Sequence, residues 1–108
     1  MKKQIITRKS QQGDVILRKL ETMPSGEQRV VARNRCVLAH GESGHSHVVE
    51  QDDAELIAIG ERMLLSIGRE AEVVHEEHKG QTLSPGIWEI GRVQEYDYFS
   101  KMARPVAD

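Results

Sequence analysis

The chain alternates short aliphatic runs with turns that carry glycine, proline or acidic residues. Residues 15–20 follow the turn signal Gly13-Asp14, and residues 29–33 and 35–39 form one long strand or two shorter ones. Runs of about four to eight such residues, bounded by turn residues, are typical of β-strands. The same pattern predicts further strands at residues 46–50, 55–59, 62–67, 70–75 and 87–96.

Residues 54–67 form the clearest local unit. Two apolar runs flank Gly60-Glu61, and a two-residue loop in which glycine supplies a positive φ is typical of a tight β-hairpin. Leucine and methionine also favour helices, so a helix over this range is the alternative. Gly60 in its centre would cost about 1 kcal/mol relative to alanine, which favours the hairpin.

These elements predict a mainly β protein, a small antiparallel barrel or sandwich of about seven to nine short strands. We expect a basic N-terminal arm over residues 1–12, a single β domain over 13–98 and a C-terminal tail over 99–108. The arm is expected to be a frayed, solvated segment or a short edge strand, with a phosphate-binding arm as the third option.

Composition narrows the class of protein. With 108 residues, 38% hydrophobic and 30% charged, the chain is typical of one soluble globular domain. No stretch approaches the roughly 18 apolar residues of a membrane span, and a net charge of −2 argues against a dedicated nucleic-acid binder. The single cysteine, Cys36, excludes an internal disulfide, fits a reducing cytoplasm, and is expected to be a buried apolar side chain rather than a nucleophile.

All five histidines fall in two short clusters. The first holds His40, His45 and His47 around two glycines. On a strand, His45 and His47 would share one face, because side chains alternate with a period of two. Two imidazoles on one face can bind one ion at about 2.0–2.2 Å each, and the glycines allow His40 to fold back towards them.

The second cluster is His75-Glu76-Glu77-His78. Its histidines are three residues apart, which does not suit one face of a strand, so we expect His75 to end a strand and His78 to lie in the following turn. One of them, with a carboxylate from Glu76, Glu77 or Glu50, would complete a mixed site for zinc, nickel, iron or manganese. The zinc-protease pattern, with histidines four apart on a helix, is not met.

Three interpretations without metal stay open. The histidines could lie in solvated surface turns, they could line a metal-free polar or catalytic cleft, or hydrogen bonds between histidines and carboxylates could tie two turns together. If a metal is bound, affinity should fall as the pH drops through about 6, because imidazole must be neutral to bind an ion.

Two motifs carry a resemblance to the cupin superfamily. His45-Ser46-His47-Val48-Val49-Glu50, followed later by Ser84-Pro85-Gly86-Ile87-Trp88, is similar to the two cupin signatures. The resemblance implies a small β-barrel that holds a divalent metal, with His45 and His47 as the histidine pair and Glu50 as the acid. Glu50 lies closer to His47 than the cupin acid does, and Glu89 stands near the position of the later cupin histidine.

The whole chain also resembles a group of small, uncharacterised bacterial and phage-associated proteins. The shared elements are an early Gly-Asp-Val strand, a Gly-His-x-His turn, a His-Glu-Glu-His element, a Pro-Gly-aromatic strand and a Gln-Glu-Tyr segment at residues 94–96. This resemblance covers most of residues 12–98 and implies no activity.

The sequence therefore predicts a β protein that binds a divalent transition metal through His40, His45, His47, His75, His78 and Glu50. Metal-bound water would support hydrolytic or oxygen chemistry if coordination positions stay open, on a substrate that the sequence does not identify. The alternative is a metal-free structural or interaction module, such as a phage-associated assembly protein. Residues 94–99 concentrate aromatic side chains and are expected to pack as a last strand or to form a subunit contact, so a homo-oligomer stays open.

Overall fold

We describe the protein from a computed structural model, which covers residues 6–13, 15–40, 46–76 and 78–92. Within these ranges the chain forms strands and turns, with no helix. The strands are β1 (Ile6–Gln12), β2 (Val15–Leu20), β3 (Arg29–His40), β4 (Ser46–Ile59), β5 (Arg62–Ile67), β6 (Ala71–Val74), β7 (Gln81–Leu83) and β8 (Gly86–Arg92).

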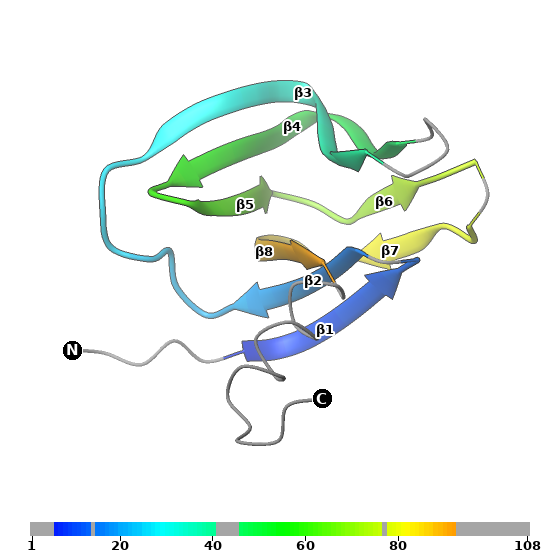
Figure 1. The fold of residues 1–108 in the computed structure, drawn as a ribbon, viewed down its shortest axis with the longest axis horizontal. Helices are drawn as coiled ribbons and strands as arrows, with labels where there is room; N and C mark the ends of the chain where they lie inside the picture. The colour runs from blue at the N-terminus through cyan, green and yellow to red at the C-terminus, as the bar shows by residue number, and fades with distance from the viewer. Residues whose placement is uncertain (1–5, 14, 41–45, 77, 93–108) are drawn as a thin grey trace, which may run out of the picture.

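All strand pairs are antiparallel, in the order β1-β2-β8-β5-β4-β6-β7, with β3 paired to β4 outside this path (Figure 1). Because β3 pairs along most of β4, both β5 and β6 take the opposite edge of β4 and follow one another along it. At the far end of the order, β1 returns to contact β7. The result is a nearly closed barrel-like sheet, which confirms the predicted fold class as the barrel rather than the sandwich.

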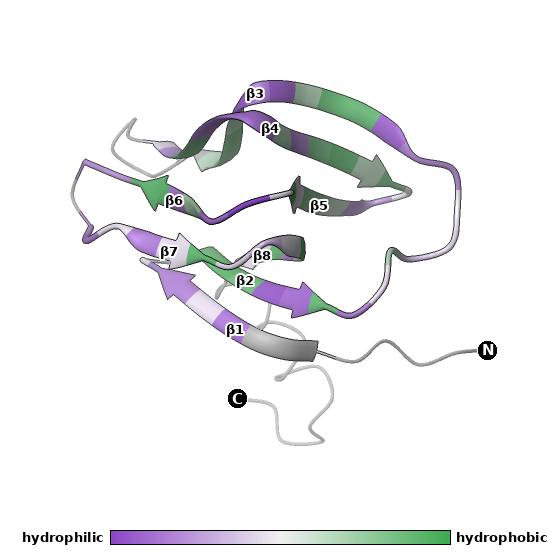
Figure 2. Ribbon diagram, turned by 180° about the vertical axis from the view of Figure 1, so that it is seen from behind, coloured by the Kyte–Doolittle hydropathy of each residue, from purple (hydrophilic) through white to green (hydrophobic). Residues whose placement is uncertain are grey.

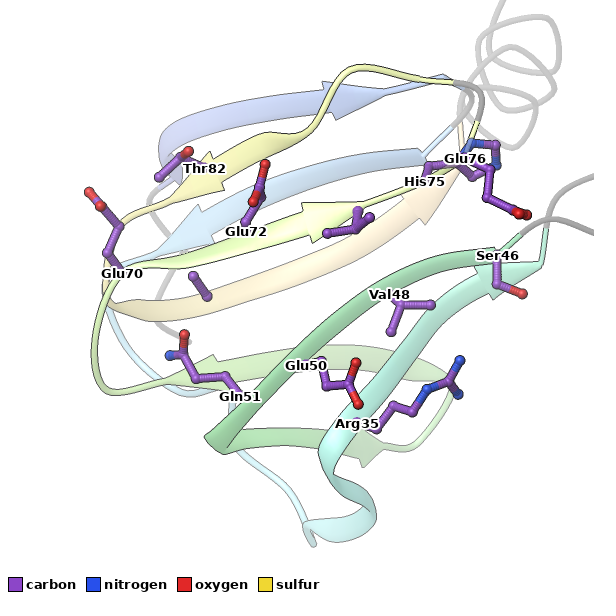
Figure 3. A pocket seen from close by; sticks show the side chains of 12 residues that line it. Arg35, Ser46, Val48, Glu50, Gln51, Glu70, Glu72, His75, Glu76 and Thr82 are labelled. Atoms are coloured by element: carbon purple, nitrogen blue, oxygen red, sulfur yellow. The ribbon is translucent and has the colours of Figure 1, made fainter.

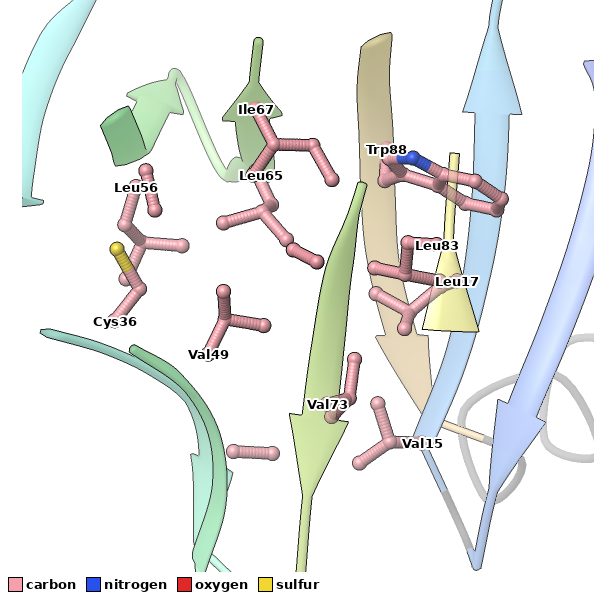
Figure 4. Packing of buried hydrophobic residues seen from close by; sticks show 13 residues of the cluster. Val15, Leu17, Cys36, Val49, Leu56, Leu65, Ile67, Val73, Leu83 and Trp88 are labelled. Atoms are coloured by element: carbon pink, nitrogen blue, oxygen red, sulfur yellow. The ribbon is translucent and has the colours of Figure 1, made fainter. Parts of the chain in front are cut away.

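The core fills the space inside this curved sheet (Figure 4). Alternating residues of the strands point inward, as Ala71 and Val73 of β6 do, while Glu72 and Val74 point outward. Trp88 is the largest fully buried side chain, and its Nε1 donates a hydrogen bond to the backbone oxygen of Ser84 at 2.9 Å. The aliphatic core that the composition predicts is thus organised around one tryptophan.

The hairpin at Gly60-Glu61 is confirmed, and the alternative helix over 54–67 is wrong. Gly60 has a φ of 60°, the left-handed conformation that a tight turn requires. The register pairs Ile59 with Arg62, so only two residues separate β4 from β5. The apolar runs on both sides are buried as strands.

Of the two options left open for residues 29–33 and 35–39, the single long strand is confirmed as β3. Other element boundaries differ from the predicted ones, since the runs at 46–50 and 55–59 form one strand, β4. β3 continues through residue 34, which separates the two apolar runs. Asn34 has a φ of 71°, and the register of β3 against β4 is irregular along the pairing. The three-residue strand β7 was not predicted, because three residues are too few to show a period.

The predicted terminal segments are only partly described. Residues 6–12 form the strand β1, while residues 1–5, residues 93–98 of the predicted domain and the tail at 99–108 lie outside the described ranges. The final aromatic segment therefore stays a prediction. Within the described residues, no helix has the length and apolar character needed to cross a membrane.

The link between β5 and β6 is fastened to β4 by side-chain hydrogen bonds. Asp53 accepts one from the backbone nitrogen of Gly68 at 3.0 Å, and Gln51 Nε2 donates one to the backbone oxygen of Arg69 at 3.3 Å. Within β4, Gln51 Nε2 also donates to Asp53 at 2.7 Å. The bonds from Gln51 and Gly68, the one from Gln51 above all, lower the pKa of the Asp53 carboxyl.

Candidate functional site

The short pairing of β4 with β6 brings the two histidine clusters together. Val48 pairs with Val74 and Val49 with Val73, so the next position of this register places His47 opposite His75. His47 follows the inward alternation of β4 and His75 that of β6, and their exposed fractions are 1% and 8%. Two histidines that are far apart in the sequence thus become neighbours at one end of the barrel.

Three imidazole rings form a compact group, which we call the imidazole cluster: His47, His75 and His78. The ring centres of His47 and His75 are 4.3 Å apart, those of His75 and His78 are 4.6 Å apart, and those of His47 and His78 are 6.1 Å apart. His78 lies in the loop between β6 and β7 and is exposed. The cluster therefore runs from the buried end of the core to the surface.

A buried glutamine orients the innermost ring. Gln12, the last residue of β1, is 1% exposed, and its Oε1 lies 2.8 Å from Nδ1 of His47. Its Nε2 donates to two backbone oxygens, those of Val73 at 2.9 Å and Lys79 at 3.0 Å. These bonds join β1, β4, β6 and the β6–β7 loop, so Gln12 helps to close the barrel where the histidines meet.

The contacts of Gln12 determine the tautomer of His47. Backbone oxygens only accept hydrogen bonds, so the amide nitrogen of Gln12 must face Val73 and Lys79, and its oxygen must face His47. An oxygen accepts, so His47 Nδ1 carries a proton. When the ring is neutral, its lone pair is then on Nε2, the arrangement that second-sphere partners impose on metal-binding histidines.

Gly13 leaves space for the exposed imidazole ring of His78. It has a φ of 60° in the turn between β1 and β2, and a Cβ added there would lie 2.6 Å from Nε2 of His78. Glycine is therefore required twice, for the backbone conformation and for the space that His78 occupies. Sequence reasoning identified Gly13 as a turn residue only and missed Gln12, because a single glutamine at the end of a polar strand carries no pattern.

We expect Gly13→Ala to displace His78 from the imidazole cluster. Gly60→Ala is the matched control, since Gly60 has the same φ of 60° and no atom within 4 Å of an added Cβ. Both variants should lose about 1–2 kcal/mol of folding free energy through backbone strain. Only Gly13→Ala should shift the NMR signals of the His78 ring. Unchanged His78 signals in Gly13→Ala would contradict the contact.

Of the remaining predicted ligands, the structure describes the side chains of Glu50 and Glu76 only. His45 and Glu77 lie outside the described residues, and of His40 the structure describes only the backbone, which pairs with Ser46. Glu50 is exposed on the outer face of β4, opposite the face that carries His47. Glu76 is also exposed, and it follows His75 directly in the chain. Within the described side chains, the ring contacts of the cluster are made by histidines.

Glu50 instead lines a hollow of about 780 Å³ on the outer face of the sheet, which we call the acidic groove (Figure 3). Its floor includes Val48 and Val74, and its walls carry Arg35 and four glutamates: Glu50, Glu70, Glu72 and Glu76. His75 lies at one end of it, beside Glu76 (Figure 3). The groove and the imidazole cluster thus lie on opposite faces of β4 and meet near His75.

Cys36 plays the part that the sequence predicts. It is fully buried in the core. Burial first, and then the negative charge of Glu55, raise the pKa of its thiol. A thiol held in its protonated form is a poor nucleophile and a poor metal ligand, so Cys36 belongs to the core and not to the site.

The ring separations are close to those of imidazoles that share one ion. A ring bound through nitrogen at about 2.0–2.1 Å has its centre about 3 Å from the ion, so two rings at a tetrahedral angle have centres about 5 Å apart. Two of the observed separations, 4.3 and 4.6 Å, are shorter than this expected separation between ring centres, and the third, 6.1 Å, is longer. No group of three or more histidine, cysteine or acidic side chains in the described ranges is arranged to hold a metal ion as it stands.

Fold and site together define a small antiparallel β-barrel protein with an imidazole cluster at one end. A family model with the description "Domain of unknown function (DUF8820)" matches residues 11–93, and the chain belongs to this family. The matched range contains Gln12, Gly13 and all three histidines of the cluster. Comparisons with curated proteins and with solved structures gave no match. This match supports an uncharacterised family, as the sequence resemblance implies, while the shared histidine motifs, the phage association and the cupin resemblance stay predictions.

Proposed function

We propose that this protein binds a divalent transition metal through His47, His75 and His78. The observation that carries the proposal is the hydrogen bond from His47 Nδ1 to Gln12, which leaves the lone pair on Nε2 in the neutral ring. Two further rings within 6.1 Å of His47 supply the remaining imidazole donors.

Metal binding requires the rings to turn rather than the backbone to move. Because His78 is exposed, a rotation about its side-chain bonds costs little packing and would bring its nitrogen towards the other two rings. The same exposure gives an ion a path from solvent. Three neutral imidazoles suit zinc, nickel and iron better than manganese, which prefers oxygen ligands.

A site with three protein ligands would keep positions open for water. Metal-bound water is acidified towards neutral pH and can act as a nucleophile, which is how such a site would support hydrolysis. Oxygen chemistry at iron is the other option that the ligand set permits. The cupin resemblance of the first histidine cluster leads to the same class of site on a different set of ligands.

The competing function is a metal-free module, including a phage-associated assembly protein, in which the imidazole cluster only fastens the barrel. The bonds of Gln12 favour this alternative as well, since they join β1, β4 and β6 without an ion. The two functions differ in what happens when metal is supplied and when His78 is removed. If the cluster only holds the strands of the barrel together, replacing the exposed His78 should leave the stability of the fold nearly unchanged.

Metal analysis of untagged protein tests the proposal. We expect about one zinc, nickel or iron per chain after purification or reconstitution, measured by elemental analysis and by titration calorimetry. His78→Ala should lower affinity at least about tenfold, because one of three ligands is lost, while circular dichroism shows an unchanged fold. His47→Ala and His75→Ala should abolish binding. Affinity should also fall as the pH drops through about 6.

His40→Ala and His45→Ala are the matched controls from the first histidine cluster. If either abolishes binding while His78→Ala does not, the ligand set proposed here is wrong and the sequence-based set is favoured. If the wild-type protein takes up no metal and zinc or nickel causes no thermal shift, the metal-free module is the better description.

A further inference from the structure

The exposed large hydrophobic side chains of the described chain fall on two surfaces. They are Val30, Val31 and Val74, with exposed fractions of 42%, 52% and 53%. Scattered exposed valines are ordinary in soluble proteins. Here, however, arginines flank Val30 and Val31, whereas glutamates outnumber the one arginine around Val74.

The basic surface is the first part of β3, residues 29–33, which we call the β3 arm. Arg29 and Arg33 flank its two valines, and all four side chains are exposed. Arg33 Nε donates to Glu55 Oε2 of the same chain at 3.1 Å in an exposed ion pair, so Arg29 contributes most of the positive charge of the arm. Figure 2 shows this stretch as a hydrophobic segment between two hydrophilic stretches of β3. β3 pairs only with β4 among the described strands, so the arm has one edge that no described strand covers.

The acidic surface is the groove on the outer face. Val74 and its cross-strand partner Val48 form an apolar floor, and four glutamates against one arginine give the walls a negative formal charge. Glu72 projects over Gly80, where an added Cβ would meet its carboxylate. The groove therefore combines the apolar floor and negative walls that a basic, apolar strand would need.

We propose that the acidic groove of one copy receives the β3 arm of a second copy. Val30 and Val31 would cover Val48 and Val74, while Arg29 and Arg33 would lie near the glutamates of the walls. Such a contact would bury all the exposed large hydrophobic side chains of the described residues. This inference does not depend on metal binding.

The position of the arm makes a closed dimer possible. Arg35, on the same strand as the arm, lines the groove, so the two complementary surfaces of each copy are neighbours (Figure 3). In two copies related by a twofold axis, the β3 arm of each copy can then lie in the acidic groove of the other at the same time. Complementary surfaces that lie far apart on a molecule would instead produce an open chain of copies.

The contact is made through side chains rather than through an extended sheet. The pairing of β3 with β4 shifts register between Val30 and Ala32, and the bulge there makes the free edge irregular. Such irregularities protect an edge against pairing with another strand. A small, charged contact of this kind should be weak and should weaken further with salt.

Sedimentation velocity on the full, untagged chain in EDTA tests the proposal, since EDTA removes any metal that could bridge two copies. Wild-type protein should dimerise with rising concentration at low ionic strength. Arg29→Glu and Glu72→Lys should each raise the dissociation constant at least about tenfold. The matched controls are Lys9→Glu and Glu21→Lys, which make comparable charge changes at exposed positions outside both surfaces and should dimerise like wild type.

A mixture of the two variants provides the decisive measurement. In the mixed dimer, the carboxylate introduced at position 29 of one chain would face the ammonium group introduced at position 72 of the other. The second contact would be native, so association should be restored, and restored association also shows that both variants are folded. A wild-type protein that stays monomeric at the highest concentration, variants that dimerise like wild type, or a mixture that fails to associate would each overturn the proposal.

Discussion

Gln12→Met is expected to lower the free energy of unfolding by about 2–4 kcal/mol and to weaken metal binding about 10–100-fold. Methionine has a similar length and shape, so packing is preserved while three hydrogen bonds are lost. The backbone oxygens of Val73 and Lys79 and the Nδ1 proton of His47 then lose their partner in a buried place. His47 also loses the contact that fixes its tautomer.

The neighbouring glutamine provides the control for this prediction. Gln11 Nε2 donates to the backbone oxygen of Gly13 at 2.9 Å in an exposed place, so Gln11→Met should change stability by less than about 0.5 kcal/mol. Chemical denaturation measures both variants, and titration calorimetry measures their affinity for zinc. If Gln12→Met destabilises the fold but binds zinc like wild type, Gln12 closes the barrel and does not serve a metal site.

Trp88→Ala is expected to cost about 3–5 kcal/mol, a large part of the stability of a small domain. Trp88 is fully buried in the main core cluster, next to Leu17, Leu65 and Leu83 (Figure 4). Removing the indole leaves a cavity that these side chains cannot fill without moving strands. The Ser84 backbone oxygen also loses its donor.

Trp88→Phe separates the effect of the cavity from that of the hydrogen bond. Phenylalanine keeps most of the apolar volume and removes the N–H, so it should cost clearly less than alanine does. Because Trp88 is the only tryptophan, unfolding of the variants must be followed by circular dichroism rather than fluorescence. A loss below about 1 kcal/mol in Trp88→Ala would mean that the core is packed less tightly than the structure indicates.

The predictions for Gln12 and Trp88 concern two parts of the same barrel, the place where it closes and its core. The core around Trp88 holds the sheet in its curved shape, and the curvature brings β1 back towards β6 and β7. The imidazole cluster lies where this curved sheet closes. A loss of core stability should therefore loosen the site, whereas removal of His78 should leave the core intact.

The local pattern of the chain predicted the strands well where turns are marked by glycine. Gly13-Asp14 and Gly60-Glu61 each separate two strands, and the apolar runs beside them are buried. It was harder to predict which apolar runs join into one continuous strand. The polar residues at 51–53 look like a turn in the sequence, but in β4 they continue the strand and bind the β5–β6 link through Gln51 and Asp53.

The candidate site was predicted in part. Sequence reasoning selected all five histidines and Glu50; the structure brings His47, His75 and His78 together, while the side chains of His40 and His45 lie outside the described residues. Glu50 lies three positions from His47, and the alternation of a strand places it on the other face. Whether the two histidine clusters meet depended on the pairing of β4 with β6, which extends over only two residue pairs.

The sequence by itself determined that this chain is a β protein with aliphatic strands, two groups of histidines and a buried cysteine, because these properties follow from local period and residue type. Only the tertiary structure decided that His47 faces His75, that Gln12 orients His47 and that Gly13 makes room for His78. The physical reason is that strand register and barrel closure arise from contacts across the whole sheet. A glutamine and a glycine at the end of β1 acquire their roles only when that closure brings β4 and β6 to them.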